Sequence, residues 1–422
     1  MSTARPAGAR EVARLVEEAH RTCWPVVLAA TVRLTRDLDL AEDCAQDAFV
    51  QALRTWPDGP PDSPAAWLST VARRVALDRL RRETTLRRKL PLLVEEPAGS
   101  DDGDEQPADP LRLVFTCCHP ALAEESQVAL TLRLMCGLTT REVAAGLLIS
   151  ESTAAARITR AKKKIAAAGI PYRIPSDAEL PARLDAVLTV VHLVYTAGHV
   201  AAGKDLTRSD LTGRALDLAR TLVRLMPSEP EPQGLLALLL MTQARAGARV
   251  SEDGELVLLA DQNRDRWDHR LVHEGIARAT GALRAAELTP AGPGRFTLQA
   301  AIAGLHVSAR SWEQTDWPAV VTMYDALLLR WPSPIVALNR AAARSLVPGA
   351  DLAAVLAELD DLGGEPVLAS YSYLPATRAD VLARLGRDAE AVTAYDEAIV
   401  LTSNETERRF LTRRRAELAE QR

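Results

Sequence analysis

The sequence is poor in aromatic residues and cysteine, and it has no long apolar run. Aromatic side chains make up 4% of the 422 residues, whereas alanine, leucine and arginine dominate, a composition that favours helix nearly throughout. Five cysteines in a chain of this length argue against a disulfide scaffold. No run of about 18 apolar residues occurs, and the first residues lack the apolar segment of a signal peptide. We therefore expect a soluble, cytoplasmic protein with no membrane partner.

Motifs for catalysis and metal binding are also missing. The chain has no HExxH pair, no glycine-rich phosphate loop and no Cys-x-x-Cys pair. The residues nearest to a metal-ligand set are Cys117, Cys118, His119 and Cys136. Adjacent cysteines seldom ligate one ion, so small buried helix residues are the simpler interpretation. We expect a protein that is not an enzyme and that has no metal and no cofactor.

Residues 260–275, ADQNRDRWDHRLVHEG, concentrate ionisable side chains in the C-terminal half. The candidate site residues there are Asp265, Asp268, His269, His273 and Glu274, with His192 and His199 upstream. They show no nucleophile with an oriented base, which leaves three interpretations. A structural polar network between helices is the simplest, sensing of a ligand or partner is the second, and catalysis is the third.

The net charge of −5 conceals a strong charge pattern along the chain. Residues 64–89 hold eight lysines and arginines against two acidic residues, and residues 151–168 hold five against one. Between them, residues 95–109 (EEPAGSDDGDEQPAD) hold seven acidic residues and no basic one. Two basic modules are therefore joined by an acidic tether that contains proline and glycine.

The most informative stretch is residues 139–165, TTREVAAGLLISESTAAARITRAKKKI, where an apolar and a basic stripe share two short helices. Spacings of four, three and four place one set of residues on the buried face of the second helix: Ala154, Ile158, Ala161 and Ile165. Ser150 or Ser152 can cap this helix, and Thr139 or Thr140 can cap the helix before it. The pattern predicts a helix-turn-helix that enters the DNA major groove, with a solvated basic helix as the alternative.

The first basic module follows an acidic segment. In residues 37–53 (DLDLAEDCAQDAFVQAL), we expect an inner face of Ala41, Cys44, Ala48 and Leu53. The polar side chains then point outward: Asp39, Glu42, Asp43, Gln46 and Asp47. In residues 61–82 (PDSPAAWLSTVARRVALDRLRR), Pro64 marks a helix start. The side chains left for solvent or a partner are Trp67, Arg73, Arg74, Asp78, Arg81 and Arg82.

These segments, in this order, resemble bacterial RNA polymerase sigma factors of the extracytoplasmic-function (ECF) class. The resemblance rests on DLAEDCAQDAF, WLSTVARRVALDRLRR, the acidic tether and the helix-turn-helix that ends in RAKKKI. It implies an all-α fold of two small helical domains followed by a C-terminal TPR-like helical array. Sigma region 2 would span residues 8–83, an acidic linker 84–110, sigma region 4 residues 111–170 and the TPR-like regulatory domain 176–422.

The resemblance also implies partners: core RNA polymerase, through its β′ and β subunits, and promoter DNA. The polymerase-binding face would be Asp39, Glu42, Asp43, Gln46, Asp47 and Phe49. Opposite charge on a basic coiled coil of β′ would raise the association rate. The element that binds and melts the −10 region would be Trp67, Arg73, Arg74, Asp78, Arg81 and Arg82.

The −35 reader implied by the resemblance is the second helix of the helix-turn-helix, with Ser152, Thr153, Ala155, Ala156, Arg157, Thr159, Arg160 and Lys163. Ala155 and Ala156 favour apolar contact with thymine methyl groups over a bidentate guanine contact. Arg157 and Arg160 are the better polar candidates. Arg74 replaces the asparagine common in the family, which adds a phosphate partner and removes a specific hydrogen bond.

The roles of the linker and of the extension stay open between alternatives. The acidic linker is either a solvated tether or an occupant of the basic RNA path of the polymerase. In the extension, Gly386, Ala391, Tyr395 and Ala398 fit a repeat of 34 residues, which predicts repeats near 301–334, 335–368 and 372–405 and a capping helix at 406–420. A concave helical array suits a protein or peptide partner. We expect the array to control activity, as a fixed platform or as an inhibitory lid. It would contact region 4 through residues 188–195.

Two further function classes compete with a sigma factor. A helix-turn-helix repressor or activator with a TPR-like sensor would read duplex DNA without polymerase, but it would need neither the acidic segment nor the basic melting helix. An enzyme is the third class.

Overall fold

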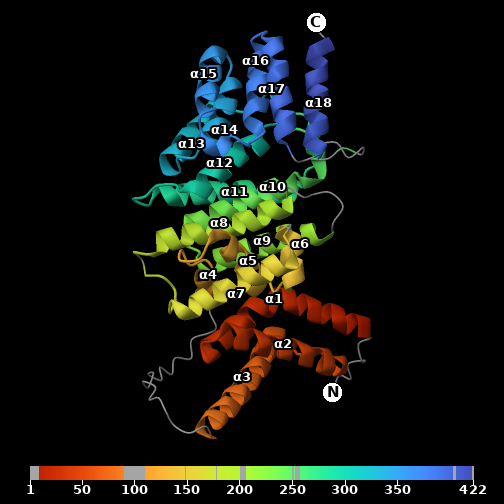
Figure 1. Cartoon of the computed structure of the whole chain (residues 1–422), viewed down its shortest axis with the longest axis vertical. Coiled ribbons are helices and arrows are strands. Elements are labelled where there is room, and N and C mark those ends of the chain that lie inside the picture. Colours follow the sequence, from red (N-terminus) through yellow and green to blue (C-terminus); the bar gives the residue numbers. More distant parts are fainter. Residues whose placement is uncertain are drawn as a thin grey trace. The chain divides into compact units, whose positions relative to one another are not determined.

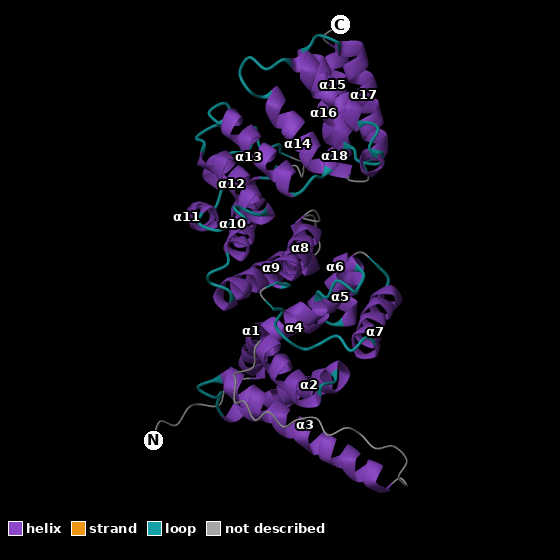
Figure 2. Ribbon diagram, turned by 90° about the vertical axis from the view of Figure 1, so that its left-hand side faces the viewer, coloured by secondary structure: helices purple, strands orange, loops and turns teal. Residues whose placement is uncertain are grey.

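The computed structural model describes residues 9–89, 110–147, 149–176, 178–199, 206–249, 251, 257–402 and 405–420. Within these ranges every regular element is a helix, as Figure 2 shows, which confirms the all-α fold expected from the composition. The predicted acidic linker lies mostly outside the described residues. The chain divides into two compact units, Met1–Leu225 and Met226–Arg422.

The first unit begins with three helices, α1 (Ala9–Thr35), α2 (Leu38–Thr55) and α3 (Pro64–Lys89), with a 3-10 turn, η1 (Trp56–Asp58), after α2. The helices pack on one another in all three pairs (Figure 1). Pro64 begins α3, as the sequence predicts. The expectation that Leu53 faces inward is wrong, because it is 48% exposed. Ala52, four residues after Ala48, holds the inner position that the helical period requires.

The described part of the first unit continues with α4 (Pro110–Cys117), α5 (Glu124–Leu134), α6 (Thr140–Leu147), α7 (Glu151–Ala167), α8 (Leu180–His199) and α9 (Leu206–Leu225). α7 packs on α5 and α6, and α8 packs on α4, α5, α6 and α9. Val187, Val191 and Val194 of α8 are fully buried. The predicted packing of the extension on residues 111–170 is therefore present for α8 as a whole, and the specific part played by residues 188–195 stays a prediction.

α8 also has the length and apolar composition of a membrane span, over Leu180–Gly198, and it is the single helix of this kind in the part of the chain that the structure describes. Its apolar side chains include Leu188 and Tyr195, which are buried where α8 packs on α4, α5, α6 and α9. Of the apolar window in this helix, 39% is buried in the structure.

The second unit is a succession of helices: α10 (Pro230–Ala244), η2 (Ala246–Ala248), η3 (Arg264–Arg266), α11 (His269–Glu287), α12 (Arg295–Ser308), α13 (Trp317–Arg330), α14 (Pro334–Ser345), α15 (Leu352–Leu362), η4 (Pro366–Leu368), α16 (Tyr373–Arg384), α17 (Asp388–Leu401) and α18 (Glu405–Glu420). From α10 onward each α-helix packs on the next one in the chain. Contacts between sequence neighbours are typical of a repeat array.

The repeat positions predicted for the C-terminal end lie where a helical hairpin needs them. Gly386 adopts φ 71° between α16 and α17, a left-handed conformation that glycine allows. Ala391, Tyr395 and Ala398 of α17 are buried in a cluster that also contains Leu411 of α18. The predicted repeat at 335–368 coincides with α14 and α15, whereas the one at 301–334 starts inside α12. The TPR-like character stays a prediction.

Candidate functional site

The acidic face of α2 is built by a helix cap. Asp37 accepts hydrogen bonds from the backbone N–H groups of Asp39 (2.8 Å) and Leu40 (2.9 Å), which fixes where the helix begins. Carboxylates at positions 39, 43 and 47 then recur every four residues on one side of α2. The side chains of Asp39, Asp43 and Asp47 are 78%, 64% and 49% exposed.

Arg79 of α3 lies against this face. Its guanidinium donates to Asp47 at 2.6 Å and to Asp43 at 3.4 Å, and both carboxylates keep much of their surface in solvent. Arg79 therefore orders the two side chains and leaves them accessible. A basic partner surface can still reach them.

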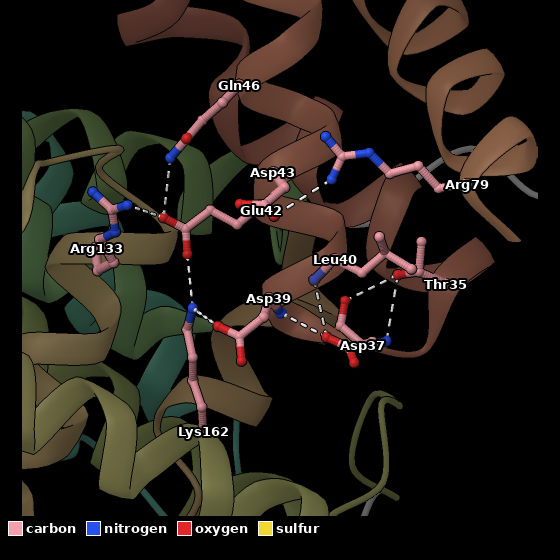
Figure 3. A network of polar contacts seen from close by, with 10 residues as sticks. All are labelled: Thr35, Asp37, Asp39, Leu40, Glu42, Asp43, Gln46, Arg79, Arg133 and Lys162. Carbon is pink, nitrogen blue, oxygen red and sulfur yellow. Dashed lines mark hydrogen bonds and ion pairs between the residues drawn. The ribbon is translucent and has the colours of Figure 1, made fainter. Parts of the chain in front are cut away.

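Glu42 departs from the sequence prediction. Its side chain is 5% exposed, and its carboxylate is ion-paired with Arg133 of α5 and with Lys162 of α7, whose Nζ lies 2.8 Å away (Figure 3). Lys162 also donates to Asp39 at 2.6 Å, and Gln46 donates to Glu42 at 3.4 Å. The expectation that Glu42 points into solvent is wrong, because α5 and α7 cover this part of α2.

The charge state of Lys162 follows from this environment. Burial disfavours the charged ammonium, but hydrogen bonds and charge from Asp39 and Glu42 outweigh it and raise the pKa of Lys162. Lys162 is therefore cationic at neutral pH. We refer to Asp39, Glu42, Arg133 and Lys162 as the Glu42 network.

An aromatic cluster lies beside the Glu42 network. Phe49 of α2 is 6% exposed, and its ring lies 4.9 Å from that of His20 and 5.8 Å from that of Trp24. Trp24 Nε1 donates to the carbonyl oxygen of Leu134 at 2.9 Å. The resemblance placed Phe49 on the docking face, but the structure buries it against α1.

The positively charged helix α3 carries the predicted −10 element. Its exposed side chains include those of Arg73, Arg74, Asp78, Arg81 and Arg82. Trp67, in the first turn of α3, is half-buried with its ring edge-to-face on Trp56, at 5.8 Å and 66°. Trp56 is 2% exposed, so it holds Trp67 while part of the Trp67 ring stays accessible. Cations beside an accessible aromatic ring suit a single strand with unstacked bases.

The two helices of the predicted helix-turn-helix are capped as expected. Thr139 and Glu142 form a reciprocal capping box, with Thr139 N–H to Glu142 at 2.7 Å and Glu142 N–H to Thr139 Oγ1 at 3.2 Å. Ser150 caps α7 by accepting from the N–H of Thr153. The four residues predicted for the buried face of α7 are all buried: Ala154, Ile158, Ala161 and Ile165.

The other side of α7 is open to solvent. Its exposed residues include Ser152, Ala155, Ala156, Thr159, Arg160 and Lys163, while Thr153 and Arg157 are half-buried. The predicted −35 reading surface is therefore accessible. The neighbouring Lys162 is turned away from it toward α2, a role that the basic run RAKKKI does not indicate.

The cysteines offer no reactive or metal-binding group in this region. Cys117, Cys118 and Cys136 are buried, and burial raises the pKa of Cys118 and of Cys136 to about 12. The described residues contain no group of three or more histidine, cysteine, aspartate or glutamate side chains that could hold a metal ion.

The candidate residues at 260–275 include one helix cap and one local ion pair. Asp268 accepts from the N–H groups of Arg270 (3.0 Å) and Leu271 (3.1 Å) at the start of α11. Glu274 pairs with Arg278 at 2.8 Å. His269 and His273 are exposed, and Asp265 is exposed in η3. His192 is half-buried in α8 of the other unit, and the side chain of His199 lies outside the described residues. These contacts fit the structural interpretation.

Comparison with known proteins supports the resemblance seen in the sequence. Residues 21–85 match sigma-70 region 2, residues 112–165 match sigma-70 region 4, and residues 183–283 match a family of unknown function, DUF6596. The chain is 41% identical to an uncharacterized protein of Rhizobium meliloti (strain 1021) over 397 residues, which cover 92% of each chain.

A second relative carries a function in its name. The probable ECF RNA polymerase sigma factor SigI of Mycobacterium tuberculosis is 31% identical over 161 residues, which are 36% of this chain and 54% of that protein. No solved structure matches this chain. Sigma regions act in binding core polymerase and promoter DNA, and they are not enzymes. With sigma-70 regions 2 and 4 followed by a DUF6596 helical extension, the chain belongs to the ECF-type sigma factors, which are DNA-binding factors of transcription initiation.

Proposed function

We propose that this sigma factor binds core polymerase through the exposed carboxylates of α2, melts the −10 element with α3 and reads the −35 element with α7. The observation that carries the proposal is the exposed pair Asp43 and Asp47, which Arg79 orders without covering. Acidic side chains held in one geometry suit a basic partner surface. Binding to polymerase and promoter DNA would place the protein in the cytoplasm.

The two DNA-contacting helices would divide the work. α3 presents four exposed arginines at positions 73, 74, 81 and 82 beside the half-buried Trp67, a combination that suits melted DNA. α7 presents an exposed face with Arg160 and Lys163 that suits the major groove and its phosphates.

The docking face can be tested by charge reversal. Asp43→Lys with Asp47→Lys should abolish retention of the protein on immobilised core polymerase, because the two basic surfaces would then repel each other. Asp43→Asn with Asp47→Asn keeps the hydrogen bonds to Arg79 possible and should weaken retention less.

The matched control is Asp58→Lys with Asp62→Lys, which makes the same charge change on exposed residues between α2 and α3. Retention of this control together with loss of the Asp43 and Asp47 variant supports the assignment. Equal retention of both charge-reversed proteins refutes it.

We also propose that the extension acts as a fixed platform for region 4. Arg183 of α8 donates to the carbonyl oxygen of Phe115 in α4, and its guanidinium carbon lies 6.0 Å from the Phe115 ring. Gly146 of α6 lies so close to Leu211 of α9 that an added Cβ would stand 2.8 Å from Leu211 Cδ1. Close packing of α8 and α9 on region 4 supports a structural role for this part of the extension. The helical array of the second unit is then available to a protein or peptide partner.

A further inference from the structure

Region 4 occupies part of the surface on α2 that we propose for core polymerase. In the Glu42 network, one oxygen of the Glu42 carboxylate faces Arg133 and the other faces Lys162, and both cations come from region 4. Lys162 also forms an ion pair with the Asp39 carboxylate. Two of the four carboxylates on the docking face are therefore engaged by region 4, while Asp43 and Asp47 pair only with Arg79 of α3 in the described residues and remain largely exposed.

The pairing of the two regions extends beyond the Glu42 network. Trp24 of α1 is 2% exposed and is bonded to the backbone of Leu134 in region 4. Gly137, in the loop after α5, packs against His20 and Trp24, where an added Cβ would stand 2.6 Å from His20 Cε1. Tyr172 donates to the carbonyl oxygen of Ala29 at 3.1 Å. Apolar packing, hydrogen bonds and ion pairs together form an interface between regions 2 and 4, which we call the closed arrangement.

We propose that region 4 and core polymerase are mutually exclusive partners of this end of α2, and that Lys162 and Arg133 hold the free protein in the closed arrangement. The proposal rests on the assignment of α2 as the docking face. Region 4 supplies the same chemistry as a basic polymerase surface, namely cations directed at Asp39 and Glu42. Both partners cannot occupy one buried carboxylate at the same time.

The sequence placement of Lys162 supports this role. It lies in the basic run of α7, but its side chain is 12% exposed and directed at α2 rather than at the predicted DNA-reading face. Lys164, two residues on, is exposed to solvent. The two lysines therefore offer a matched comparison between a residue of the closed arrangement and a solvated one.

Removal of the Lys162 ammonium should shift the protein toward the open state. The closed arrangement loses two charge-assisted hydrogen bonds, whereas in the open state Asp39 and Glu42 are hydrated in variant and wild type alike. A closed form that excludes polymerase lowers the apparent affinity by the fraction of open molecules. Hydrogen bonds to charged groups are strong enough for a change of about tenfold or more in that fraction.

The experiment measures binding of full-length protein to core polymerase without DNA, by a titration with fluorescently labelled core. We expect Lys162→Ala to bind at least about tenfold more tightly than wild type, and Lys162→Arg and Lys164→Ala to bind like wild type. Unchanged or weaker binding of Lys162→Ala overturns the proposal. Failure of wild type to bind core at all would instead refute the docking function.

A second measurement distinguishes opening of the interface between regions 2 and 4 from general unfolding of the variant. Hydrogen exchange of the free protein should show faster exchange at residues 134–138 in Lys162→Ala than in Lys164→Ala, with exchange in the core of α1 to α3 unchanged. Equal exchange at residues 134–138 in both variants overturns the closed arrangement as the state of the free protein.

Discussion

Gly137→Ala offers a sharp test of the packing between regions 2 and 4. Gly137 has φ 69°, a left-handed conformation that strains alanine by about 1–2 kcal/mol. An added Cβ would also stand 2.6 Å from His20 Cε1 and 3.1 Å from Trp24 Cγ. Trp24 is buried and bonded to Leu134, so it cannot withdraw easily. Overpacking of this kind costs about 1–3 kcal/mol, and it acts only while the two regions are paired.

Gly169→Ala is the matched control. Gly169 has φ 58°, and nothing lies within 4 Å of the position that its Cβ would take. The control therefore carries the backbone strain without the clash. The difference between the two variants isolates the contact of Gly137 with α1.

The assay is affinity for core polymerase. Gly137→Ala should bind more tightly than Gly169→Ala by about fivefold to a hundredfold, which corresponds to the clash of about 1–3 kcal/mol. Thermal unfolding checks that both proteins fold. Equal affinities in two folded variants would refute the reasoning, because the clash would then have no closed state to act on.

Three further predictions follow from the site. Arg160→Ala should weaken binding to duplex promoter and reduce its salt dependence, whereas Trp67→Ala should mainly slow strand opening on promoter that is already bound. A duplex-binding assay and permanganate footprinting on the same promoter check this. Equal loss of duplex affinity in both variants, with normal strand opening, would contradict it. Burial, with a smaller contribution from Arg214, lowers the pKa of His20 to about 4. The neutral ring therefore contributes stability above the unfolded pKa of about 6.5 that is lost as the pH falls toward 4, and melting curves of His20→Gln should lack this part of the acid sensitivity. Deletion after residue 175 removes α8 and α9 and should abolish transcription by unfolding region 4, whereas deletion after residue 225 leaves the first unit whole and tests the second unit alone. A gain of transcription on deletion after residue 225 would support an inhibitory lid. Wild-type transcription by both truncated proteins would refute both the fixed platform and the lid.

Local features of the fold were predictable because they depend on neighbours in the chain. The buried face of α7 follows from spacings of three and four, and the caps at Thr139 and Ser150 follow from side chains that bond the next turn. The exposed arginines of α3 follow in the same way. Leu53 was misplaced because its distance of five from Ala48 does not fit the helical period, whereas that of Ala52 does.

What the sequence did not indicate is which long-range partner covers a polar face. Periodicity places Glu42 on the polar side of α2, but the Lys162 that buries it lies 120 residues away. Nothing in the run RAKKKI distinguishes Lys162 from its neighbours. The local sequence around Arg133 likewise gives no sign that its partner lies on α2. Trp24 and His20 were missed for the same reason, since their partners at Leu134 and Gly137 are distant in the chain.

The most direct test of the central claim is transcription of fragmented genomic DNA by core polymerase with and without this protein, with the transcript 5′ ends mapped by sequencing. The account predicts new start sites that share two upstream elements at a constant spacing, and their loss with the Asp43→Lys and Asp47→Lys variant. Start sites identical to those of core polymerase alone would contradict it.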